Sequence, residues 1–440
     1  MKKSLLFLIL AATLVFATSC PNSETPDEPE DPDAITAPVV LKILAYGDPQ
    51  NEEGQDFVRI CAEFEAANPL IDIQYECRFD EDYHHRVTER LASGDIPDIA
   101  YMGADVRWGE AWKNAGQQID NTPYMPSNID KRLIPDFYGT GVKPYIPLGG
   151  SNFCTVIGVN MQLLEEIGGT LPTTYDEFKA LAALCQDHGK MCLITEGASD
   201  WVWGSCVMSG IIPRTTGNLK WVQDAVAGKE LFTDADFVAA LDVLRQWVAD
   251  GILDVSSLNY VTWQSREKFC NEEALMIIDG QWEFAEHNYG DLSEHMKLIP
   301  IPPVPGQVGC AGSVAGAWQV DYGITKKGAT SSDPNVLKAA KKWLTYFHSK
   351  EETTIRLNNG SITCPIITDF DYSDFNNLVR QKVLLSMYPI CDVIDSYLTG
   401  NANDVLNAGM KDIVSRATEE GADQLAGSLA QQVQTAFNLQ

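Results

Sequence analysis

Aromatic and carboxylate side chains stand together at the ends of several apolar stretches of this 440-residue chain. Tyr46 and Asp48 follow the first stretch, and Asp80 follows the second. Asp279 ends a later stretch, just ahead of Trp282. Indole and phenol rings can stack on the flat, weakly polar CH face of a sugar, while carboxylates accept hydrogen bonds from its hydroxyls. The chemistry that these residues predict is noncovalent binding of a small polar molecule.

Two further segments add the same kinds of side chain. One reads Gly-Ala-Asp-Val-Arg-Trp-Gly and contributes Asp105, Arg107 and Trp108. The other is a polar stretch with several glycines, in which Trp201 and Trp203 stand two positions apart. Both segments follow predicted strands, so we expect them in loops.

Each candidate also has a purely structural explanation. A tryptophan lies in a core more often than against a ligand, and the alternating pattern after Trp318 points that side chain toward a core. Asp48 and Asp105 could cap helix N-termini from turns. Arg107 could be a solvated loop charge. All of these residues are therefore candidates for ligand contact rather than assigned contacts.

Motifs for covalent or metal chemistry do not occur in the sequence. There is no Gly-x-Ser-x-Gly elbow, His-Glu-x-x-His pair or phosphate loop. Cys185, His188 and Cys192 approach the spacing of a zinc site, but no second pair of ligands accompanies them. Glycoside hydrolysis needs two carboxylates about 5 to 9 Å apart, and among 61 acidic residues some pair can always be nominated. We expect binding without catalysis, and neither a metal nor a cofactor.

Apolar periodicity predicts the elements that would position these side chains. In the first part of the chain we expect strands at 39–46, 71–75 and 99–102, separated by helices that end near Pro69 and Gly94. His84 and His85 are predicted to lie on the surface of the second helix. The β-α-β-α-β order is typical of a mainly parallel sheet with helices on its faces.

The same pattern restarts after Pro147. Thr174 and Glu177 stand at the spacing of a capping box ahead of an apolar helix face. The chain from about Asp369 reads as mostly helical. The further strands that we expect are 153–159, 191–194, 274–278 and 318–324, and the further helices are 161–167, a long one from about 237 to 251, and 336–347.

Length and charge narrow the class of protein. A chain of 440 residues is long enough for two or three domains. The formal charge is −29, and about −25 remains on the part that follows the acidic stretch described next. Such a field repels polyphosphate, so we expect no nucleic-acid partner. We expect a monomer, and the eleven cysteines are compatible with either disulfides or buried thiols.

The N-terminus has the pattern of an export signal. Lys2 and Lys3 precede an apolar run at 5–17, and Thr18-Ser19-Cys20 follows. This segment resembles a bacterial lipoprotein signal, which implies cleavage before Cys20 and acylation of that residue. Two or more acyl chains anchor a protein stably to a membrane. Residues 21–37 are acidic and proline-rich, as expected for an extended linker.

Several ordered segments together resemble the extracellular solute-binding proteins of ATP-binding-cassette importers, in the family typified by maltose-binding protein. The segments are Tyr46-Gly47-Asp48, Leu91-Ala92-Ser93-Gly94-Asp95-Ile96-Pro97-Asp98-Ile99, Gly158-Val159-Asn160, Leu171-Pro172-Thr173-Thr174-Tyr175-Asp176-Glu177-Phe178, Glu273-Ala274-Leu275-Met276 with Gly280 and Trp282, and Ala339-Ala340-Lys341-Lys342-Trp343-Leu344. Each segment alone is a weak signal, and six in the family's order make a strong one.

The resemblance implies a type II periplasmic-binding-protein fold, with two α/β lobes and a ligand cleft between them. Lobe 1 would comprise 38–150 plus 314–362, and lobe 2 would comprise 151–313 plus 363–440. In such sheets ligands lie outside the carboxyl ends of the strands. The resemblance also implies a membrane permease as partner and a location in the cell envelope, facing the periplasm or the exterior.

The resemblance assigns roles to some of the candidates. Trp282 stands where the family commonly places a stacking aromatic residue, and Trp201 or Trp203 where it often supplies another. Trp318 lies near an expected crossing between the lobes. The stretch from Asp105 to Trp108 looks like the family's ligand loop, although one inserted residue leaves the direction of its side chains open.

Different ligand classes fit the same residues. The abundance of tryptophan at predicted loop positions favours a mono- or oligosaccharide. A polyamine would also use acidic rims and aromatic faces, through cation–π contacts, and a polyol phosphate or a peptide could occupy the same scaffold. A secreted glycoside hydrolase is the alternative from a different class of protein.

Overall fold

The structure is a computed structural model of the chain, and it describes residues 33–50, 52–132, 134–147, 149, 151–360, 362, 371–373 and 375–439. The chain divides into two units, Met1–Ala34 and Ile35–Gln440, and the architecture below is that of the second. The predicted signal segment, Cys20, most of the linker and the side chain of Asp80 lie outside the described part.

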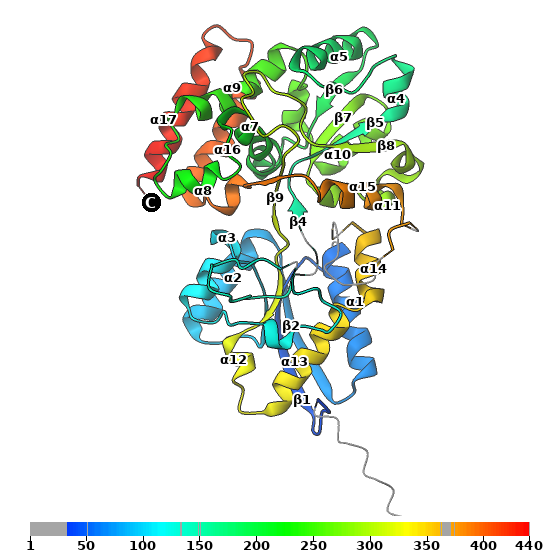
Figure 1. Ribbon diagram of the computed structural model, residues 1–440, viewed down its shortest axis with the longest axis vertical. Helices are drawn as coiled ribbons and strands as arrows, with labels where there is room; N and C mark the ends of the chain where they lie inside the picture. Colours follow the sequence, from blue (N-terminus) through cyan, green and yellow to red (C-terminus); the bar gives the residue numbers. More distant parts are fainter. Residues whose placement is uncertain are drawn as a thin grey trace, which may run out of the picture. The chain divides into compact units, whose positions relative to one another are not determined.

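The first lobe is built on a four-stranded sheet with the order β10-β3-β1-β2. β1 pairs in parallel with β2 and with β3, while β10 runs antiparallel to β3. The strands are β1 Val39–Tyr46, β2 Ile71–Arg78, β3 Ile99–Met102 and β10 Asp321–Ile324. The helices of this lobe include α1 Glu52–Ala67, α2 Asp80–Ser93, α3 Val106–Asn114, α12 Lys326–Ala329, α13 Pro334–Phe347 and α14 Lys350–Asn358 (Figure 1).

Alternating side chains of β1 explain the core of this lobe. Leu41 and Ile43 are buried and pack in one cluster with Ile60 of α1 and Trp343 of α13. The exposed alternate positions, such as Lys42, face away from that core. The predicted strands and helices of the first part are therefore confirmed.

The second lobe is built on a sheet with the order β6-β7-β5-β8. Its strands are β5 Val156–Asn160, β6 Met191–Ile194, β7 Ala274–Asp279 and β8 Met296–Ile299. Only β6 and β7 pair in parallel; β5 runs antiparallel to both β7 and β8. The expectation of a mainly parallel sheet fits the first lobe and not this one. The first residue of β5, Val156, lies opposite the last residue of β7, Asp279, so the two strands run in opposite directions.

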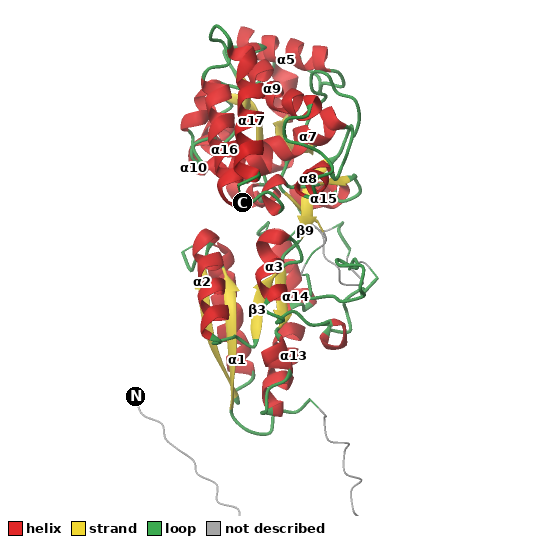
Figure 2. Ribbon diagram, turned by 90° about the vertical axis from the view of Figure 1, so that its left-hand side faces the viewer, coloured by secondary structure: helices red, strands yellow, loops and turns green. Residues whose placement is uncertain are grey.

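Helices flank the strands of both sheets (Figure 2). The capping box is confirmed, with the Thr174 hydroxyl accepting from the Glu177 amide and the Glu177 carboxylate accepting from the Thr174 amide. Helices of the second lobe include α4 Met161–Glu166, α5 Tyr175–Asp187, α6 Asp200–Val202, α7 Ser209–Thr216, α8 Trp221–Val226, α9 Ala235–Ala249, α10 Thr262–Cys270, α11 Glu286–Tyr289, α15 Asn377–Leu385, α16 Gly400–Ser415 and α17 Leu425–Phe437.

Short strands link the two sheets. β4 Ser151–Phe153 and β9 Val314–Trp318 pair antiparallel, and β11 Ile390–Cys391 joins the other edge of β9. Two predicted strands are therefore divided: 153–159 into β4 and β5, and 318–324 into β9 and β10. The division has a geometric cause, because each segment leaves one sheet and enters another. Within the described residues, no helix is long and apolar enough to cross a membrane.

Candidate functional site

The carboxyl end of β1 carries a cluster of aromatic rings, here called the lobe-1 aromatic cluster: Tyr46, Phe79, Tyr83, Tyr101 and Trp108. Tyr46 lies at its centre, stacked on Tyr101 with 5.0 Å between ring centroids and 16° between planes. Phe79 lies 5.2 Å from Tyr46, and Trp108 meets the same ring edge-on at 5.2 Å. Tyr46 therefore contacts several rings at once, while Phe79 stays exposed at the rim of the cluster.

The first turn of α3 follows this cluster. The Asp105 carboxylate accepts a hydrogen bond from the Trp108 amide at 2.7 Å and so caps the helix. Arg107 donates to Glu81 at 2.7 Å and to the ring nitrogen of His84 at 3.3 Å. The His84 ring packs 4.5 Å from Trp108, so His84 is half-buried against a candidate residue and not simply on the helix surface as predicted.

Asp105 also faces the second lobe. The pKa of its carboxyl is raised to about 7, chiefly by burial and also by the nearby Asp395 carboxyl, while the hydrogen bond from the Trp108 amide and the charge of Arg107 oppose the shift. Asp395 belongs to the short helix Ile394–Ser396, where it accepts a hydrogen bond from Ser205 at 2.6 Å and lies 3.9 Å from Arg107. A carboxyl pair thus lies where the two lobes meet beside the aromatic cluster.

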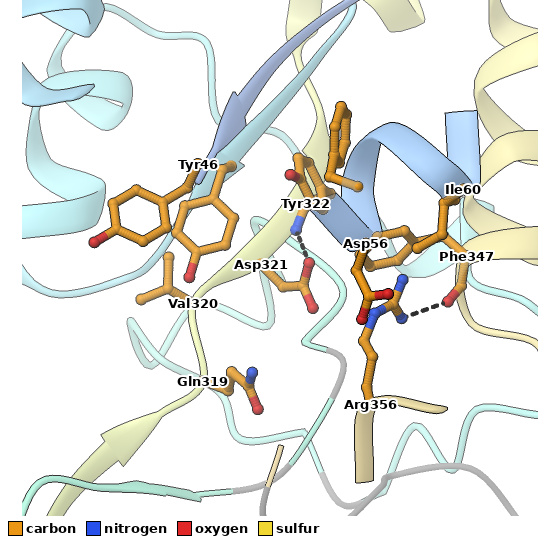
Figure 3. A pocket seen from close by; sticks show the side chains of 11 residues that line it. Tyr46, Asp56, Ile60, Gln319, Val320, Asp321, Tyr322, Phe347 and Arg356 are labelled. Carbon is orange, nitrogen blue, oxygen red and sulfur yellow. Dashed lines mark hydrogen bonds between the residues drawn. The ribbon is translucent and has the colours of Figure 1, made fainter. Parts of the chain in front are cut away.

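A pocket opens at the same end of the first sheet (Figure 3). Its empty volume is about 430 Å³, including space open to solvent. Tyr46 and Tyr101 line one side, and Gln319 and Val320 enter from the segment between β9 and β10. The lining combines phenol rings with amide and charged groups, but the space that water-sized molecules can occupy is only about 40 Å³, so the pocket is a small polar recess of the first lobe.

Arg356 of α14 is one of three charged residues of this pocket, with Asp56 and Asp321, that sequence reasoning missed. It is buried, its Nη1 donates to the Phe347 carbonyl at 2.9 Å, and its guanidinium carbon lies 3.7 Å from the Phe347 ring centroid. Its Nη2 has no hydrogen-bond partner. Burial lowers the pKa of Arg356, while the carboxylates of Asp321 and Glu352 raise it. No local pattern in the sequence marks an arginine in the last turn of a helix as part of a pocket.

The second lobe presents a pair of open indoles. Trp201 lies in α6 beyond β6, and Trp282 follows β7; their side chains are 38% and 36% exposed. Their ring centroids are 5.8 Å apart at 48° between planes. A Cβ at Gly280 would lie 2.1 Å from the Trp282 ring, so this glycine permits the indole to fold against the backbone.

Trp203 takes a different place from Trp201. It is fully buried, and its indole nitrogen donates to the Gly197 carbonyl at 2.9 Å. A Cβ at Gly197 would lie 2.5 Å from the Trp203 ring, so any larger residue at this position would clash with the buried indole. This corrects the expectation of a loop position for Trp203, which is a core residue because it points into the cluster beneath the sheet.

Buried carboxyl groups lie beneath the two open indoles. Asp279 at the end of β7 is buried, and its Oδ2 has no partner. Burial raises the pKa of Asp279 well above its usual range, and the neighbouring Glu196 and Glu283 raise it further. Glu283 pairs with Arg266 of α10 at 2.9 Å, and the Glu196 carboxylate accepts from the Thr262 hydroxyl.

The remaining candidates divide between turn and core. Asp48 accepts a hydrogen bond from the Gln50 amide at 2.9 Å, which is a turn contact, and its side chain is partly exposed. Trp318 ends the linking strand β9 and packs edge-on against Phe137 in the core of the first lobe, with centroids 6.3 Å apart. The structure thus brings together Tyr46, Asp105, Arg107 and Trp108 in one lobe, and Trp201, Asp279 and Trp282 in the other.

Among the described residues, no group of three or more His, Cys, Asp or Glu side chains is placed to hold a metal ion. Nine cysteines of the described part are free thiols, while Cys364 lies outside it.

Solved structures share this fold over nearly their whole length. A chitin oligosaccharide binding protein superposes with a TM-score of 0.72 at 18% identity, covering 90% of this chain and 99% of its own. The maltose-bound MalE3 of T. maritima gives 0.65 at 17% identity, with 90% and 99% covered. A sugar transporter from Bacillus licheniformis in complex with stachyose gives 0.64 at 15% identity, with 91% and 100% covered. At these identities the likeness concerns the fold.

The search of curated proteins found no match. The family model for bacterial extracellular solute-binding proteins matches residues 48–354, well over half of the chain. That match confirms the family predicted from the ordered segments, and it implies a periplasmic or exterior location. The chain belongs to the bacterial extracellular solute-binding proteins.

Proposed function

We propose that the protein captures a mono- or oligosaccharide between its two lobes and delivers it, unaltered, to a membrane permease. The single observation that carries this proposal is the open indole pair of Trp201 and Trp282 at the carboxyl ends of β6 and β7. An exposed aromatic pair beside polar side chains suits the alternating CH and hydroxyl surfaces of a sugar ring.

The first lobe would supply the opposite wall. Tyr46 ends β1, and Asp105, Arg107 and Trp108 follow the carboxyl end of β3, which is where open α/β sheets place their ligands. Hinge closure around the ligand would bury it and create the form that a permease recognises. Similar folds named for chitin oligosaccharide, maltose and stachyose support a sugar as the ligand class.

The anchor and the permease belong to the same proposal. Acylation at Cys20 would hold the protein at the membrane surface, and residues 21–37 would act as a linker between the anchor and the lobes. Labelling with a radioactive fatty acid in cells tests the anchor, with Cys20→Ala as the control; label that persists in this variant would contradict it.

A polyamine is the second candidate, and one observation favours it. Asp279, Glu196 and Glu283 place three carboxyl groups under the indole pair with Arg266 as the paired cation. An amine could pair with such groups and stack on the indoles.

One titration separates these functions. Purified protein is titrated with glucose, xylose, maltose, N-acetylglucosamine oligomers, stachyose and spermidine while tryptophan fluorescence is followed, and the sugars are then analysed by chromatography. Saturable quenching by an intact sugar supports the proposal. Saturation by spermidine alone supports the polyamine, and appearance of shorter sugars would show an enzyme.

A further inference from the structure

A third tryptophan, which the sequence reasoning did not single out, is exposed in the same lobe. Trp263 of α10 is 61% exposed, more than Trp201 or Trp282. These three are the tryptophans with more than a third of their surface exposed among the ten of the chain, all of which the structure describes. Exposed aromatic side chains that gather in one region commonly mark a binding surface.

The contacts of α10 place Trp263 at the same end of the sheet as the indole pair. Thr262, its neighbour, donates to the carboxylate of Glu196, which follows β6. Three residues after Trp263, Arg266 donates to Glu283, which directly follows Trp282. Because positions i and i+3 of a helix lie on one face, Trp263 emerges on the side of α10 that meets the Trp282 segment.

The course of the chain agrees with this placement. α10 ends at Cys270, a few residues before β7 begins at Ala274, so the helix runs back along the strand. The first turn of α10 therefore lies toward the carboxyl end of β7, close to the short helix Gln281–Glu283 that contains Trp282. Trp263 makes no ring contact with Trp201 or Trp282, so it adds a separate surface beyond theirs rather than a third wall of the same pair.

The helix that carries Trp263 is held firmly. The pair between Arg266 and Glu283 is charge-assisted at 2.9 Å, and the Glu283 side chain is only 5% exposed. Glu196 is also buried where it receives the Thr262 hydroxyl. A stacking group on a helix fixed at two points loses little further freedom when a ligand binds.

We propose that Trp263 is an additional stacking subsite that extends the Trp201–Trp282 surface and makes the protein select oligosaccharides of three or more units over shorter sugars. This inference rests on the proposed function. A single sugar ring is covered by the indole pair, whereas a longer chain leaving that pair along α10 reaches Trp263. Affinity therefore rises with chain length until the third indole is occupied.

The test is a comparison of chain lengths by isothermal titration calorimetry. Wild type, Trp263→Ala, Trp263→Phe and Leu231→Ala are titrated with one- to six-unit members of the β-1,4-linked N-acetylglucosamine, β-1,4-linked xylose and α-1,4-linked glucose series. Leu231 is a matched control because it is exposed but lies ahead of α9, away from α10. Circular dichroism and thermal unfolding show that each variant is folded.

The expected result is specific to long ligands. Trp263→Ala weakens binding of the longer members about tenfold, the lower range of an aromatic anchor, and leaves one- and two-unit members within about twofold. Trp263→Phe retains most of the length preference, and Leu231→Ala changes nothing. Equal affinities of wild type and Trp263→Ala at every length overturn the inference while leaving the proposed function intact. If no sugar of any series binds wild type, the proposed function itself fails.

Discussion

The two lobes differ in how they present the aromatic side chains at their strand ends: only Phe79 of the five packed rings in the lobe-1 aromatic cluster is exposed, whereas both indoles of the second lobe's pair are exposed. In the first lobe, Tyr46 is covered by Tyr101, Phe79 and Trp108, so the rings mainly contact one another. In the second lobe, Trp201 and Trp282 keep more than a third of their surface exposed. Under the proposed function, the second lobe would offer the stacking surface and the first lobe a wall with polar groups at its edge.

The ion pair beside the lobe-1 aromatic cluster and the carboxyl groups beneath the indole pair also differ in exposure to solvent. The ion pair of Arg107 and Glu81 beside the first cluster lies at the surface, with the Glu81 side chain 64% exposed. The carboxyl groups of Glu196, Asp279 and Glu283 beneath the second are buried. The Arg107–Glu81 pair should therefore contribute little to stability, whereas the buried carboxyl groups beneath the indole pair should contribute more.

The largest expected effect separates Trp203 from Trp201. Trp203→Ala removes a fully buried indole and leaves a cavity, so the free energy of unfolding should fall by about 3–5 kcal/mol. Trp201→Ala truncates an exposed ring and should change stability by less than about 1 kcal/mol. Urea unfolding followed by circular dichroism measures both. Equal losses in the two variants would contradict the core assignment of Trp203.

The next effect concerns ligand affinity. Trp282→Ala should weaken binding of a sugar by about 1–3 kcal/mol, because it removes an open stacking face. Phe79→Ala serves as the counterpart in the lobe-1 aromatic cluster, since Phe79 is 45% exposed but packs against Tyr46. Its effect on affinity should be smaller. Calorimetry on both folded variants measures the difference, and a larger loss for Phe79→Ala would reverse the roles of the lobes.

A third effect is the pH dependence of stability. Burial raises the pKa of Glu196 from 4.5 to about 7, while its bond with Thr262 opposes the shift. Between those pH values the folded protein holds a proton that the unfolded chain has released, so stability falls as pH rises from about 4.5 to 7. One such proton contributes a slope of at most about 1.4 kcal/mol per pH unit.

The variant Glu196→Gln isolates this contribution. Its amide oxygen can still accept the Thr262 hydroxyl but no longer titrates, so the decline between pH 4.5 and 7 should be shallower than in wild type. Denaturation at a series of pH values gives the difference. The comparison stops at pH 7 because Lys382, whose pKa burial lowers to about 7, acts in the opposite direction above it. Identical slopes for the two proteins would rule out Glu196 as the titrating group.

The sequence predicts the first lobe better than the second, because local periodicity determines the elements of the first lobe while a linking strand determines the direction of β5 in the second. The strands and helices of the first lobe follow from local periodicity, and β1 begins and ends where its apolar pattern does. The direction of β5 in the second sheet depends on where the linking strand β4 delivers the chain, which no local pattern contains. Linking strands that change sheets likewise divided two predicted strands, the mostly apolar stretch 153–159 and the alternating stretch 318–324.

The candidate site shows the same distinction. The aromatic and acidic residues at strand ends could be nominated because loop position follows from strand position. Whether a nominated indole faces the core or the solvent could not be predicted in this way. Trp201 and Trp203 are two residues apart in one helical stretch, yet Trp201 is exposed and Trp203 is buried. His84 and Arg356 gained their places through contacts with residues distant in the sequence, Trp108 and Asp321 among them.

The smallest expected effect is the loss of stability on removing the exposed charge of Glu81, compared with the buried charge of Glu283. Glu81→Gln breaks an ion pair whose acidic partner is largely in water, so stability should change by less than about 1 kcal/mol. Glu283→Gln removes a carboxylate buried against Arg266 and should cost clearly more, because the guanidinium loses its buried partner. Adding salt to 1 M should remove most of the Glu81 contribution and little of the Glu283 contribution, since exposed charges are screened and buried ones are not. A Glu81→Gln loss that matches the Glu283→Gln loss at both salt concentrations would mean that burial does not decide how much these two ion pairs contribute to stability.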